Sequence, residues 1–400
     1  MRSSLLSFLL VSIGVCGGGG CGSASIAAPA ENAHVPPAVA ATSSTRSTAQ
    51  PAESPLPFTA TPIARFDHPW AFAFIPGTKS ALVTEQQGAL KHWTEGGPIR
   101  DVAGVPKVDH GGQGGVGDVA LAPDFATSRM IYLSWVEPGD GGTRGAALGR
   151  AKLVDDAQGL RLENLRIVWR QTPKTTGRGH FSHRIAFSPD GKYLFLTSGD
   201  RQKLAPAQDL SNNLGATLRL FPDGSVPPDN PFADRKDAGA QIWSYGHRNL
   251  LGIAFDANGQ LWTSEMGPRG GDELNREVEG ANYGWPVVSN GDHYDGSNIP
   301  DHPTRPEFNA PATWWNPVIS PAGLMFVRGD RYAGWQGDAL LPGLSSRALV
   351  RVTFGAGGAR EVARYPMGAR IRAVAEREDG TVWLLEDSDR GRLIRLAPRD

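Results

Sequence analysis

The sequence predicts an all-β fold, and the arrangement that fits it best is a six-bladed β-propeller with four-stranded antiparallel blades. A short apolar strand, a Gly or Asp-Gly turn and a second apolar strand recur six times, near residues 70, 119, 185, 253, 324 and 374. Strands joined by such turns are hairpin signals. Their spacing of roughly sixty residues is slightly long for a four-stranded blade, so the excess is expected in loops. No run of about ten residues or more shows a helical period.

Composition agrees with many turns and a large aromatic core. The chain has 400 residues, of which 50 are Gly and 31 Pro, and this suits short strands better than long helices. Its 11 Trp are costly to leave exposed. A pair of β-sandwiches is an alternative, whereas the units are too long for the coils of a parallel β-helix. The net charge of −1, from 40 basic and 41 acidic residues, attracts neither nucleic acid nor an anionic membrane.

Residues 1–22 are predicted to be a signal peptide. Arg2 provides a positive charge, and the apolar run Leu5–Val15 is too short to span a bilayer. Cys16 and Cys21 both lie at the end of this segment, so the mature domain has no disulfide framework. Three fates stay open: lipid attachment at one cysteine, simple cleavage near the Ala-rich stretch, or an uncleaved anchor. The protein is expected to be periplasmic or otherwise exported, and to contact a membrane only through such an anchor.

The segment 23–57 is rich in Ala, Pro, Ser and Thr and has almost no large apolar residue. Because it cannot bury a core, it is predicted to be a disordered tether. The propeller domain is predicted to cover 58–400, and the tether would hold it away from a membrane.

The segment 241–285 concentrates residues suited to chemistry. Arg248 and Asn249 follow an aromatic-rich strand, and their guanidinium and amide suit a carboxylate or quinone oxygen, although a strand-end salt bridge is the plainer alternative. The loop GPRGGDE, at 267–273, has glycines that let carbonyls turn toward one point and acids that add hard oxygen ligands. Calcium takes roughly six to eight such oxygens, but a long turn with solvated acids is also compatible.

His180 lies just before a predicted strand, in TTGRGHFSHRIAF. A loop histidine that enters the inner strand of a blade would face the central channel. There, a neutral imidazole can take a proton from a substrate hydroxyl. A surface or structural histidine is the alternative, and His183 and His247 compete with His180 on equal terms.

Two further segments are candidates for ligand contacts. The glycine-rich run 111–115 lacks the Lys-Ser/Thr of a phosphate loop, so a nucleotide site is not expected. It could approach a flat ligand with Gln113 reaching inward, or be a plain loop. Arg370 and Arg372 alternate on a strand and so point to the same side. They repel each other unless they reach water, as exposed edge charges would, or an anion lies between them.

These motifs together resemble the soluble glucose/sorbosone dehydrogenase family, which uses pyrroloquinoline quinone (PQQ). Within it they are most similar to the bacterial periplasmic aldose sugar dehydrogenases. The resemblance covers about 65–398 and includes, in order, GQGGxxDVALAPDF, GHFxxR, WSYGxRN, GPRGGDE with NYGWP, and RIR. It implies a six-bladed propeller with the cofactor over the central channel. The implied activity is oxidation of aldose sugars at C1 to lactones, with electrons passing to an artificial dye or a respiratory-chain acceptor.

The resemblance also implies roles for individual residues. His180 would be the general base that takes the C1 hydroxyl proton while the C1 hydride passes to C5 of the quinone. Arg248 would stabilise charge on the quinone oxygen. Contacts with cofactor or substrate are implied for Gln113, Asn249 and Tyr294, and contacts with the cofactor carboxylates for Arg370 and Arg372.

Two calcium ions are implied by the same resemblance. Carbonyls of Gly267 and Pro268 would hold the calcium that polarises the quinone. Glu273 and the carbonyl of Tyr283 would hold a second, structural calcium, with Asp272 a weaker candidate.

The chain departs from the family at two positions. In the loop PGLSSRAL, expected before the inner strands of the penultimate blade, Ser345 replaces a cofactor-contacting Lys, for which Arg347 is a partial substitute. Gly179 stands where some members have a polar residue before the catalytic His. The competing functions are a calcium-dependent lactonase-type propeller and a non-catalytic propeller that binds sugar or cofactor.

Overall fold

Six antiparallel blades around a common axis make up the computed structural model, which describes residues 45–47 and 55–399. The innermost strand of each blade contacts the innermost strands of its two neighbours, so the ring is closed. The predicted fold class is therefore confirmed.

Five blades are continuous in sequence. The first contains β3 (Pro69–Phe74), β4 (Ser80–Glu85), β5 (Ala89–Thr94) and β6 (Arg100–Asp101). The second contains β7 (Val116–Leu121), β8 (Met130–Pro138), β9 (Arg144–Asp156) and β10 (Gly159–Arg170). The third contains β11 (Ser182–Phe187), β12 (Leu194–Ser198), β13 (Ala216–Leu220) and β14 (Ile242–Tyr245). The fourth contains β15 (Leu250–Phe255), β16 (Leu261–Glu265), β18 (Asp272–Arg276) and β20 (Thr313–Trp315). The fifth contains β21 (Met325–Phe326), β22 (Ala339–Pro342), β23 (Ala348–Gly355) and β24 (Gly358–Pro366).

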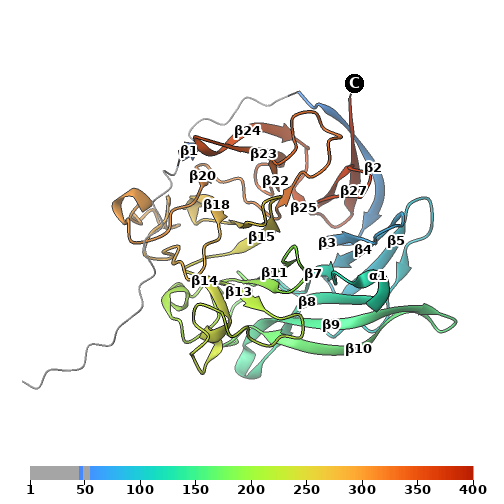
Figure 1. Ribbon diagram of the computed structural model, residues 1–400, viewed down its shortest axis with the longest axis horizontal. Helices are drawn as coiled ribbons and strands as arrows, with labels where there is room; N and C mark the ends of the chain where they lie inside the picture. Colours follow the sequence, from blue (N-terminus) through green and yellow to red (C-terminus); the bar gives the residue numbers. More distant parts are fainter. Residues whose placement is uncertain (1–44, 48–54, 400) are drawn as a thin grey trace, which may run out of the picture. The chain divides into compact units, whose positions relative to one another are not determined.

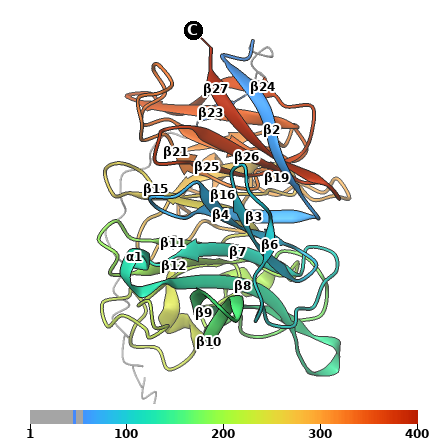
Figure 2. The same ribbon diagram turned by 90° about the vertical axis from the view of Figure 1, so that its right-hand side faces the viewer.

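The sixth blade is completed from both ends of the propeller domain. It contains β25 (Ile371–Glu376), β26 (Val382–Glu386) and β27 (Gly391–Pro398), and its outer strand is β2 (Phe58–Phe66). β2 pairs antiparallel with β27, from Phe58 opposite Pro398 to Phe66 opposite Gly391, and Figure 2 shows the two strands side by side. The sequence indicated a domain that begins at 58, but not that its first strand belongs to the last blade.

The six hairpins expected from the sequence are the inner strand pairs of the six blades. In the third blade, for example, β11 and β12 pair with Ile185 opposite Leu196 and are joined by the turn that contains Asp190 and Gly191. Figure 1 shows β11, β15 and β25 near the centre, with β10, β24 and β27 toward the rim. The sequence therefore located the part of each blade that lines the axis.

Other elements are short. Two small strands, β17 (Arg269–Gly270) and β19 (Gly291–Asp292), pair within the long insertion of the fourth blade. The α-helix α1 (Phe125–Ser128) has four residues, and no helix in the described ranges is long and apolar enough to cross a membrane. Strand β1 (Thr45–Ser47), in the range expected to be a tether, pairs parallel with β20. The predicted signal peptide lies outside the described residues.

The core lies between the blades. A cluster of buried apolar side chains fills each interface between adjacent sheets. At one interface, Leu340 and Leu349 of the fifth blade pack with Leu384 and Ile394 of the sixth. Burial of each such side chain stabilises the fold by about 1.5–3 kcal/mol. Among the largest fully buried side chains are Trp135, Trp315 and Trp383.

A single arginine connects the blades near the axis. Arg184, on β11, is 6% exposed. Its guanidinium is hydrogen-bonded, at 2.5 to 3.3 Å, to the carboxylate of Asp118 and to the carbonyl oxygens of Leu251, Ala322 and Arg372. It also lies 3.9 Å from the centre of the Trp70 ring. The inner region of every other blade therefore contacts this one side chain.

Candidate active site

The predicted site residues converge because of the way in which a propeller is built. Every blade repeats the same order of strands from inside to outside, so the segments that enter the inner strands meet at one end of the axis. We call this end the mouth. Its segments carry Gln113 before β7, His180 before β11, Arg248 and Asn249 before β15, and Arg370 before β25. Loops from different blades of one rigid scaffold thus surround a single site.

His180 is held at the mouth by a buried carboxylate. Its Nδ1 lies 2.7 Å from Oδ1 of Asp200, which follows β12 of the same blade. Asp200 also accepts hydrogen bonds from Nε1 of Trp285 and from the backbone N–H of Gln202, each at 2.8 Å. Because an ionised carboxylate only accepts, Nδ1 carries the proton and Nε2 the lone pair. No residue in the described part of the chain is hydrogen-bonded to Nε2.

The electrostatics favour a neutral imidazole beside an ionised carboxylate. Burial lowers the pKa of His180 below its ordinary value, and the charge of Arg248 acts in the same direction, while the Asp200 hydrogen bond opposes them. Burial would raise the pKa of Asp200, but hydrogen bonds from His180 and Trp285 outweigh it and hold that pKa low. This is the protonation state in which Nε2 can take a proton from a substrate.

Gln113 supports the backbone that carries His180. Its Oε1 accepts a hydrogen bond from the His180 N–H at 2.6 Å, and its own N–H donates to the carbonyl of Arg178 at 2.8 Å. A Cβ on Gly112 would lie 2.6 Å from that carbonyl oxygen, so this close approach requires glycine. Gln113 itself is exposed, and its side-chain NH₂ has no partner among the described residues.

The two competing histidines are structural. His183 is 2% exposed, stacks on Trp70 with ring centres 5.3 Å apart, and has Nδ1 2.8 Å from the hydroxyl of Ser134. Burial lowers its pKa to about 3. His247 is fully buried, and its Nδ1 lies 2.8 Å from Glu265. Both ring nitrogens of His247 are hydrogen-bonded, and His183, unlike His180, has no carboxylate partner among the described residues.

Arg248 leaves one buried donor without a partner. Its Nη1 donates to the carbonyl of Met266 and its Nη2 to the hydroxyl of Tyr294, both at 3.0 Å. Nε is buried and unpaired within the described structure. The guanidinium carbon lies 5.3 Å from the centre of the Trp285 ring. A carbonyl or carboxylate oxygen of a ligand would satisfy this N–H, which otherwise carries a desolvation cost.

Asn249 and Tyr294 differ in how open they are. Asn249 is fully buried, and its Oδ1 accepts a hydrogen bond from the Ser182 hydroxyl at 3.2 Å. Tyr294 is 73% exposed and reaches the mouth through its contact with Arg248. A ligand contact by Asn249 thus stays a prediction, and in this structure its side chain joins the third and fourth blades.

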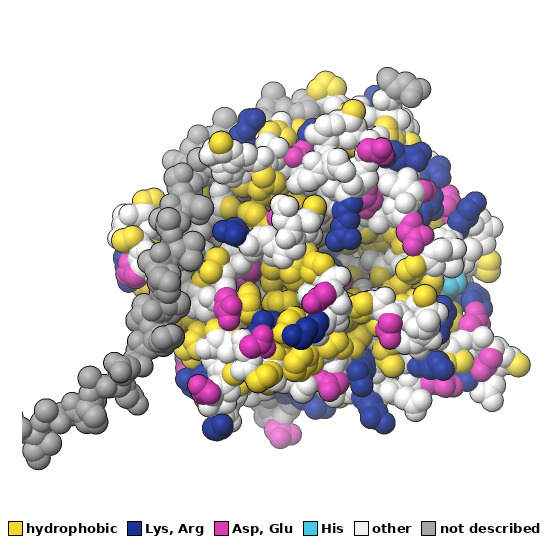
Figure 3. Space-filling model, in the orientation of Figure 1, with side chains coloured by type: hydrophobic (Ala, Val, Ile, Leu, Met, Phe, Trp, Pro, Cys, Tyr) yellow, Lys and Arg dark blue, Asp and Glu magenta, His cyan; other side chains and the backbone are white. Residues whose placement is uncertain are grey.

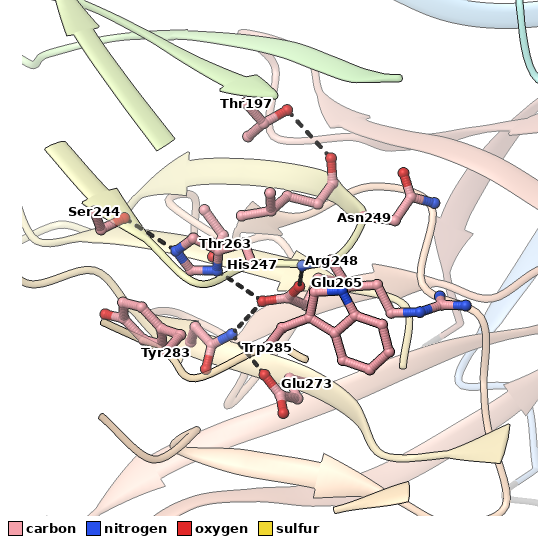
Figure 4. A network of polar contacts seen from close by, with 12 residues as sticks. Thr197, Ser244, His247, Arg248, Asn249, Thr263, Glu265, Glu273, Tyr283 and Trp285 are labelled. Atoms are coloured by element: carbon pink, nitrogen blue, oxygen red, sulfur yellow. Dashed lines mark hydrogen bonds and ion pairs between the residues drawn. The ribbon is translucent and has the colours of Figure 1, made fainter. Parts of the chain in front are cut away.

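A network of buried charges lies beneath Arg248 (Figure 4). The backbone N–H of Arg248 donates to Oε2 of Glu265 at 2.7 Å, and the other oxygen of Glu265 binds His247. Burial alone would lower the pKa of His247, but Glu277 and Glu265 outweigh burial and raise it above its ordinary value. These two carboxylates therefore favour the protonated form of His247.

All four predicted metal ligands line one small cavity beside this network. The cavity has a volume of about 10 Å³ and is bordered by Gly267, Pro268, Glu273 and Tyr283. A space of this size holds one water molecule or one ion. The carbonyl oxygens of Gly267 and Pro268 accept no hydrogen bond from the described residues. They are therefore available to a cation.

The acids at this cavity fit a bound cation. The amide of Asn275 bridges Glu265 and Glu273, at 2.9 and 3.0 Å, and Glu273 has no ion-pair partner among the described residues. Burial, followed by the charge of Glu265, raises the pKa of Glu273 well above its ordinary range. No group of three or more His, Cys, Asp or Glu in the described ranges has metal-site geometry. A cation here would draw largely on carbonyls, which suits calcium.

Asp272 organises the loop and is not an open ligand. It is 1% exposed, and its Oδ1 accepts from the N–H of Gly267 at 2.9 Å. Its Oδ2 accepts from the N–H groups of Ile319 and Ser320 at 2.7 and 2.6 Å. Burial raises its pKa to about 6. These bonds orient the turn whose carbonyls line the cavity.

The anion between the paired arginines comes from the protein. Nε of Arg370 lies 2.6 Å from Oδ2 of Asp387, and Nη2 of Arg372 lies 2.6 Å from Oδ1 of the same carboxylate. Their mutual repulsion is therefore relieved without a ligand. The remaining N–H groups of both side chains stay available for a second anion.

The structure shows where both departures from the family pattern lie. Ser345 and Arg347 are exposed in the loop between β22 and β23, so this loop follows the inner strands of the fifth blade, and the expectation that it precedes them was wrong. A Cβ added at Gly179 would lie 2.5 Å from Oε1 of Gln202. The side chain of Gln202 thus occupies the space that a side chain at 179 would need.

A larger groove, of about 560 Å³, lies away from the mouth. It is bordered by the turns that follow β11 and β15, which are at the opposite end of those strands from His180 and Arg248. Its apolar lining includes Tyr193, Phe195, Trp243 and Phe255. On the face shown in Figure 3, hydrophobic side chains gather near the centre, and charged side chains lie both among them and around them. Size alone would have pointed to the end of the propeller opposite the predicted site residues.

Three partners of the predicted residues were not found from the sequence. Asp200 pairs with His180, Glu265 with Arg248, and Trp285 with Asp200. Asp200 and Glu265 each lie where the second strand of a blade returns to the mouth, in TSGD and TSEM. Carboxylates in nearly the same place, offset by one residue between TSGD and TSEM, were the available signal.

Comparison with known proteins identifies the family. The chain matches the family described as Glucose / Sorbosone dehydrogenase over residues 66–395. It is 39% identical over 345 residues to the aldose sugar dehydrogenase YliI of Escherichia coli, which covers 84% of this chain and 91% of that protein.

Two solved structures extend the comparison. The soluble aldose sugar dehydrogenase of Escherichia coli, in its apo form, is 36% identical and covers 86% of this chain and 100% of its own, with a TM-score of 0.79. The PQQ-bound aldose sugar dehydrogenase of Streptomyces coelicolor is 26% identical and covers 86% of this chain and 99% of its own, with a TM-score of 0.67.

Proposed function

The chain belongs to the glucose/sorbosone dehydrogenase family, and we propose that it is a PQQ-dependent aldose sugar dehydrogenase that oxidises sugars at C1 to lactones. The observation that carries this proposal is the pair of His180 and Asp200 at the mouth, with Nε2 of the histidine unpaired and Arg248 beside it. A base and a buried cation at the same end of the propeller suit removal of a hydroxyl proton together with stabilisation of an oxygen anion.

In this proposal the protein positions the reactants and moves one proton. Nε2 of His180 takes the proton of the C1 hydroxyl, and the charge that develops on the imidazole is balanced by Asp200 at Nδ1. The unpaired Nε–H of Arg248 donates to a cofactor oxygen on which negative charge develops. The chemistry that PQQ supplies when bound is acceptance of the C1 hydride at its C5 atom.

Further residues would hold the cofactor and calcium. Arg370 and Arg372 would bind cofactor carboxylates through the N–H groups that Asp387 does not use. Contacts with cofactor or substrate are proposed for Gln113, Asn249 and Tyr294. One calcium ion would fill the single-ion cavity that Gly267, Pro268, Glu273 and the Tyr283 carbonyl border, in place of the two ions that the resemblance implies.

The test is dye-linked oxidation of a panel of aldoses by the purified domain, with and without PQQ and calcium. Activity that needs both additions supports the proposal. A folded protein that binds sugar or PQQ but reduces no dye would instead be a non-catalytic binding propeller. Turnover of a lactone without any quinone would indicate the lactonase alternative.

We also propose that the enzyme is exported, with residues 1–22 as the signal peptide and 23–57 as a tether, and passes electrons to a respiratory-chain acceptor. Mass spectrometry of the protein from its native membrane and periplasmic fractions would test this. A lipid on Cys16 or Cys21 would identify an anchor, and a start after both cysteines would identify simple cleavage. Retention of residues 1–22 in the soluble fraction would contradict the signal peptide.

A further inference from the structure

We propose that Trp285 is a positioning residue for the base: its indole N–H fixes Asp200, which in turn fixes the His180 imidazole. This inference rests on the proposed function, because it assigns His180 as the base. It adds a third member to the pair and makes the indole a link between two blades.

The hydrogen bonds form a continuous chain across the mouth. Nε1 of Trp285 donates to Oδ2 of Asp200 at 2.8 Å, and Oδ1 of Asp200 lies 2.7 Å from Nδ1 of His180. No other described residue donates to Oδ2. Asp200 is 0% exposed and Trp285 6%, so no bulk water is at hand to replace a lost donor. A buried carboxylate oxygen without its donor costs free energy, and the carboxylate is then less tightly fixed.

Hydrogen bonds also hold the backbone of Trp285, next to the segment that leads into the fourth blade. Its backbone N–H donates to the carbonyl of Gly246 at 2.9 Å, and its carbonyl accepts from Nε2 of Gln208 at 2.8 Å. Gly246 has a φ of 76°, and a Cβ there would lie 2.2 Å from Oδ1 of Asn282. Only glycine permits this approach, which sets the NYGW turn against the segment that carries Arg248.

The indole therefore fixes the positions of two functional groups relative to each other. Its N–H reaches Asp200 in the third blade, and its ring lies 5.3 Å from the guanidinium carbon of Arg248 at the entrance of the fourth. The base and the cation come from different blades, so their separation depends on a contact that spans the interface. Reacting groups that are misplaced by about 1 Å can lose roughly a hundredfold in rate.

Removal of the indole N–H should strengthen the attraction between Asp200 and a protonated His180. The indole N–H and the N–H of Gln202 both donate hydrogen bonds to the carboxylate of Asp200, and both lower its pKa. The charged groups that face the imidazole are Asp200, Arg248 and Arg201. Without the indole donor the carboxylate is more basic, so the imidazole should hold its proton to higher pH.

The experiment compares Trp285→Phe with Trp315→Phe. Trp315 is a matched control, because its Nε1 also donates to a buried carboxylate, Oε2 of Glu361 at 2.7 Å, within the apolar core of the fourth and fifth blades. The first readout is the NMR titration of His180 in the cofactor-free protein, with the signal assigned by His180→Asn. The second is kcat and KM for dye-linked aldose oxidation.

Trp285→Phe should move the His180 titration to higher pH by up to about one unit. It should also lower kcat roughly tenfold with little change in KM, as expected when a general base loses its alignment. Trp315→Phe should lower the melting temperature without either effect. An unchanged titration and unchanged kcat in folded Trp285→Phe would overturn the proposal and make the indole a packing group.

A second variant and a second readout distinguish failure of this proposal from failure of the proposed function. If Trp285→Phe does not fold, Trp285→His restores a ring N–H donor, and a His180 titration far from that of the wild type in this variant would also overturn the proposal. If the wild-type protein oxidises no aldose, the proposed function fails. The NMR titration still decides whether Trp285 positions His180.

Discussion

His180 and His183 are three residues apart and have opposite surroundings. Both have left-handed backbone conformations, with φ of 49° and 56°, which are uncommon for non-glycine residues and occur at functional sites. The turn sends His183 into the core against Trp70 and leaves His180 at the mouth beside Asp200. The direction of each side chain, which the sequence leaves open, thus separates a candidate base from a structural residue.

Replacement of the base is the most direct test of this assignment. His180→Asn should lower kcat by roughly 10²–10⁴-fold, because the general base is lost while the Asp200 hydrogen bond can be kept by the amide. Dye-linked turnover and PQQ binding should be measured together, and binding should stay close to that of the wild type. His92→Asn, on β5 in the first blade, is the control and should keep its activity. Wild-type kcat in His180→Asn would exclude His180 as the base.

The pH dependence should report the lowered pKa of His180. Burial lowers this pKa below the ordinary 6.5, so the base becomes deprotonated at lower pH than a free histidine. The acidic limb of kcat/KM should therefore have its midpoint below pH 6.5, and activity should fall only as the pH drops through that midpoint.

The variant Asp200→Asn tests the direction in which the acidic limb of the pH profile moves. The Asp200 hydrogen bond raises the pKa of His180, so its loss should move the acidic limb to still lower pH while kcat also falls. Trp285→Phe should move the limb the other way. A midpoint above pH 6.5 in the wild type would show that burial does not dominate at His180.

At the scale of elements, the loop 267–273 shows how a short segment becomes a cation site. Asp272 ties the two ends of its turn together by accepting from the Gly267 N–H, and it ties the turn to the segment of Ile319. The carbonyls of Gly267 and Pro268 have no hydrogen-bond donor among the described residues. Glu273, the first acid beyond, lies buried beside Glu265 with an amide between them. The loop thus presents oxygen atoms and negative charge to one small space.

Calcium should stabilise the protein through Glu273. A ligand that binds only the folded state at about a hundred times its Kd adds roughly 2.7 kcal/mol to the free energy of unfolding. The melting temperature of metal-free protein should therefore rise on addition of calcium, and much less with magnesium, which prefers water and octahedral geometry. Glu273→Gln should abolish most of this rise.

The matched control for that variant is Glu361→Gln. Glu361 is also a buried carboxylate, but it pairs with Arg364 in the fifth blade. Its variant should be less stable than the wild type and yet show the full calcium response. An equal calcium response in Glu273→Gln would place the ion elsewhere.

Elements also show what the sequence could predict. The inner hairpins were recognisable because apolar strands flank D-G and N-G turns, as at Asp190-Gly191 and Asn258-Gly259. Outer strands such as β6, with two residues, carry little pattern of their own and are formed by pairing. Candidate site residues could be named where motifs run along the chain. Asp200, Glu265 and Trp285 were missed because their roles depend on partners in other segments or blades.

At the scale of the whole molecule, the propeller is closed by two different devices. At the rim, β2 completes the blade of β27, so the first and last strands of the domain are hydrogen-bonded to each other. At the axis, Arg184 contacts the inner region of all five other blades. Neither device is visible as a local pattern, because each joins residues that are far apart in sequence.

Arg184 should therefore contribute more to stability than an ordinary buried ion pair. Burial lowers its pKa to about 10, so the guanidinium remains charged at neutral pH. Arg184→Met would leave the buried carboxylate of Asp118 without its cation, a change that typically costs roughly 3–5 kcal/mol. Three carbonyl oxygens in other blades would also lose a donor. The free energy of unfolding should be measured by urea denaturation.

Two comparisons separate the ion pair from the connection between blades. Arg364→Met breaks a buried pair with Glu361 inside β24 alone, and it should destabilise the protein less than Arg184→Met does. Asp118→Asn added to Arg184→Met removes the unpaired charge, and it should recover only part of the loss, because the carbonyls remain without their donor. If the double variant regains the wild-type stability, or if Arg364→Met costs as much, Arg184 acts only as a counter-ion. A larger, incompletely recovered loss would show that one side chain at the axis holds the six blades in register.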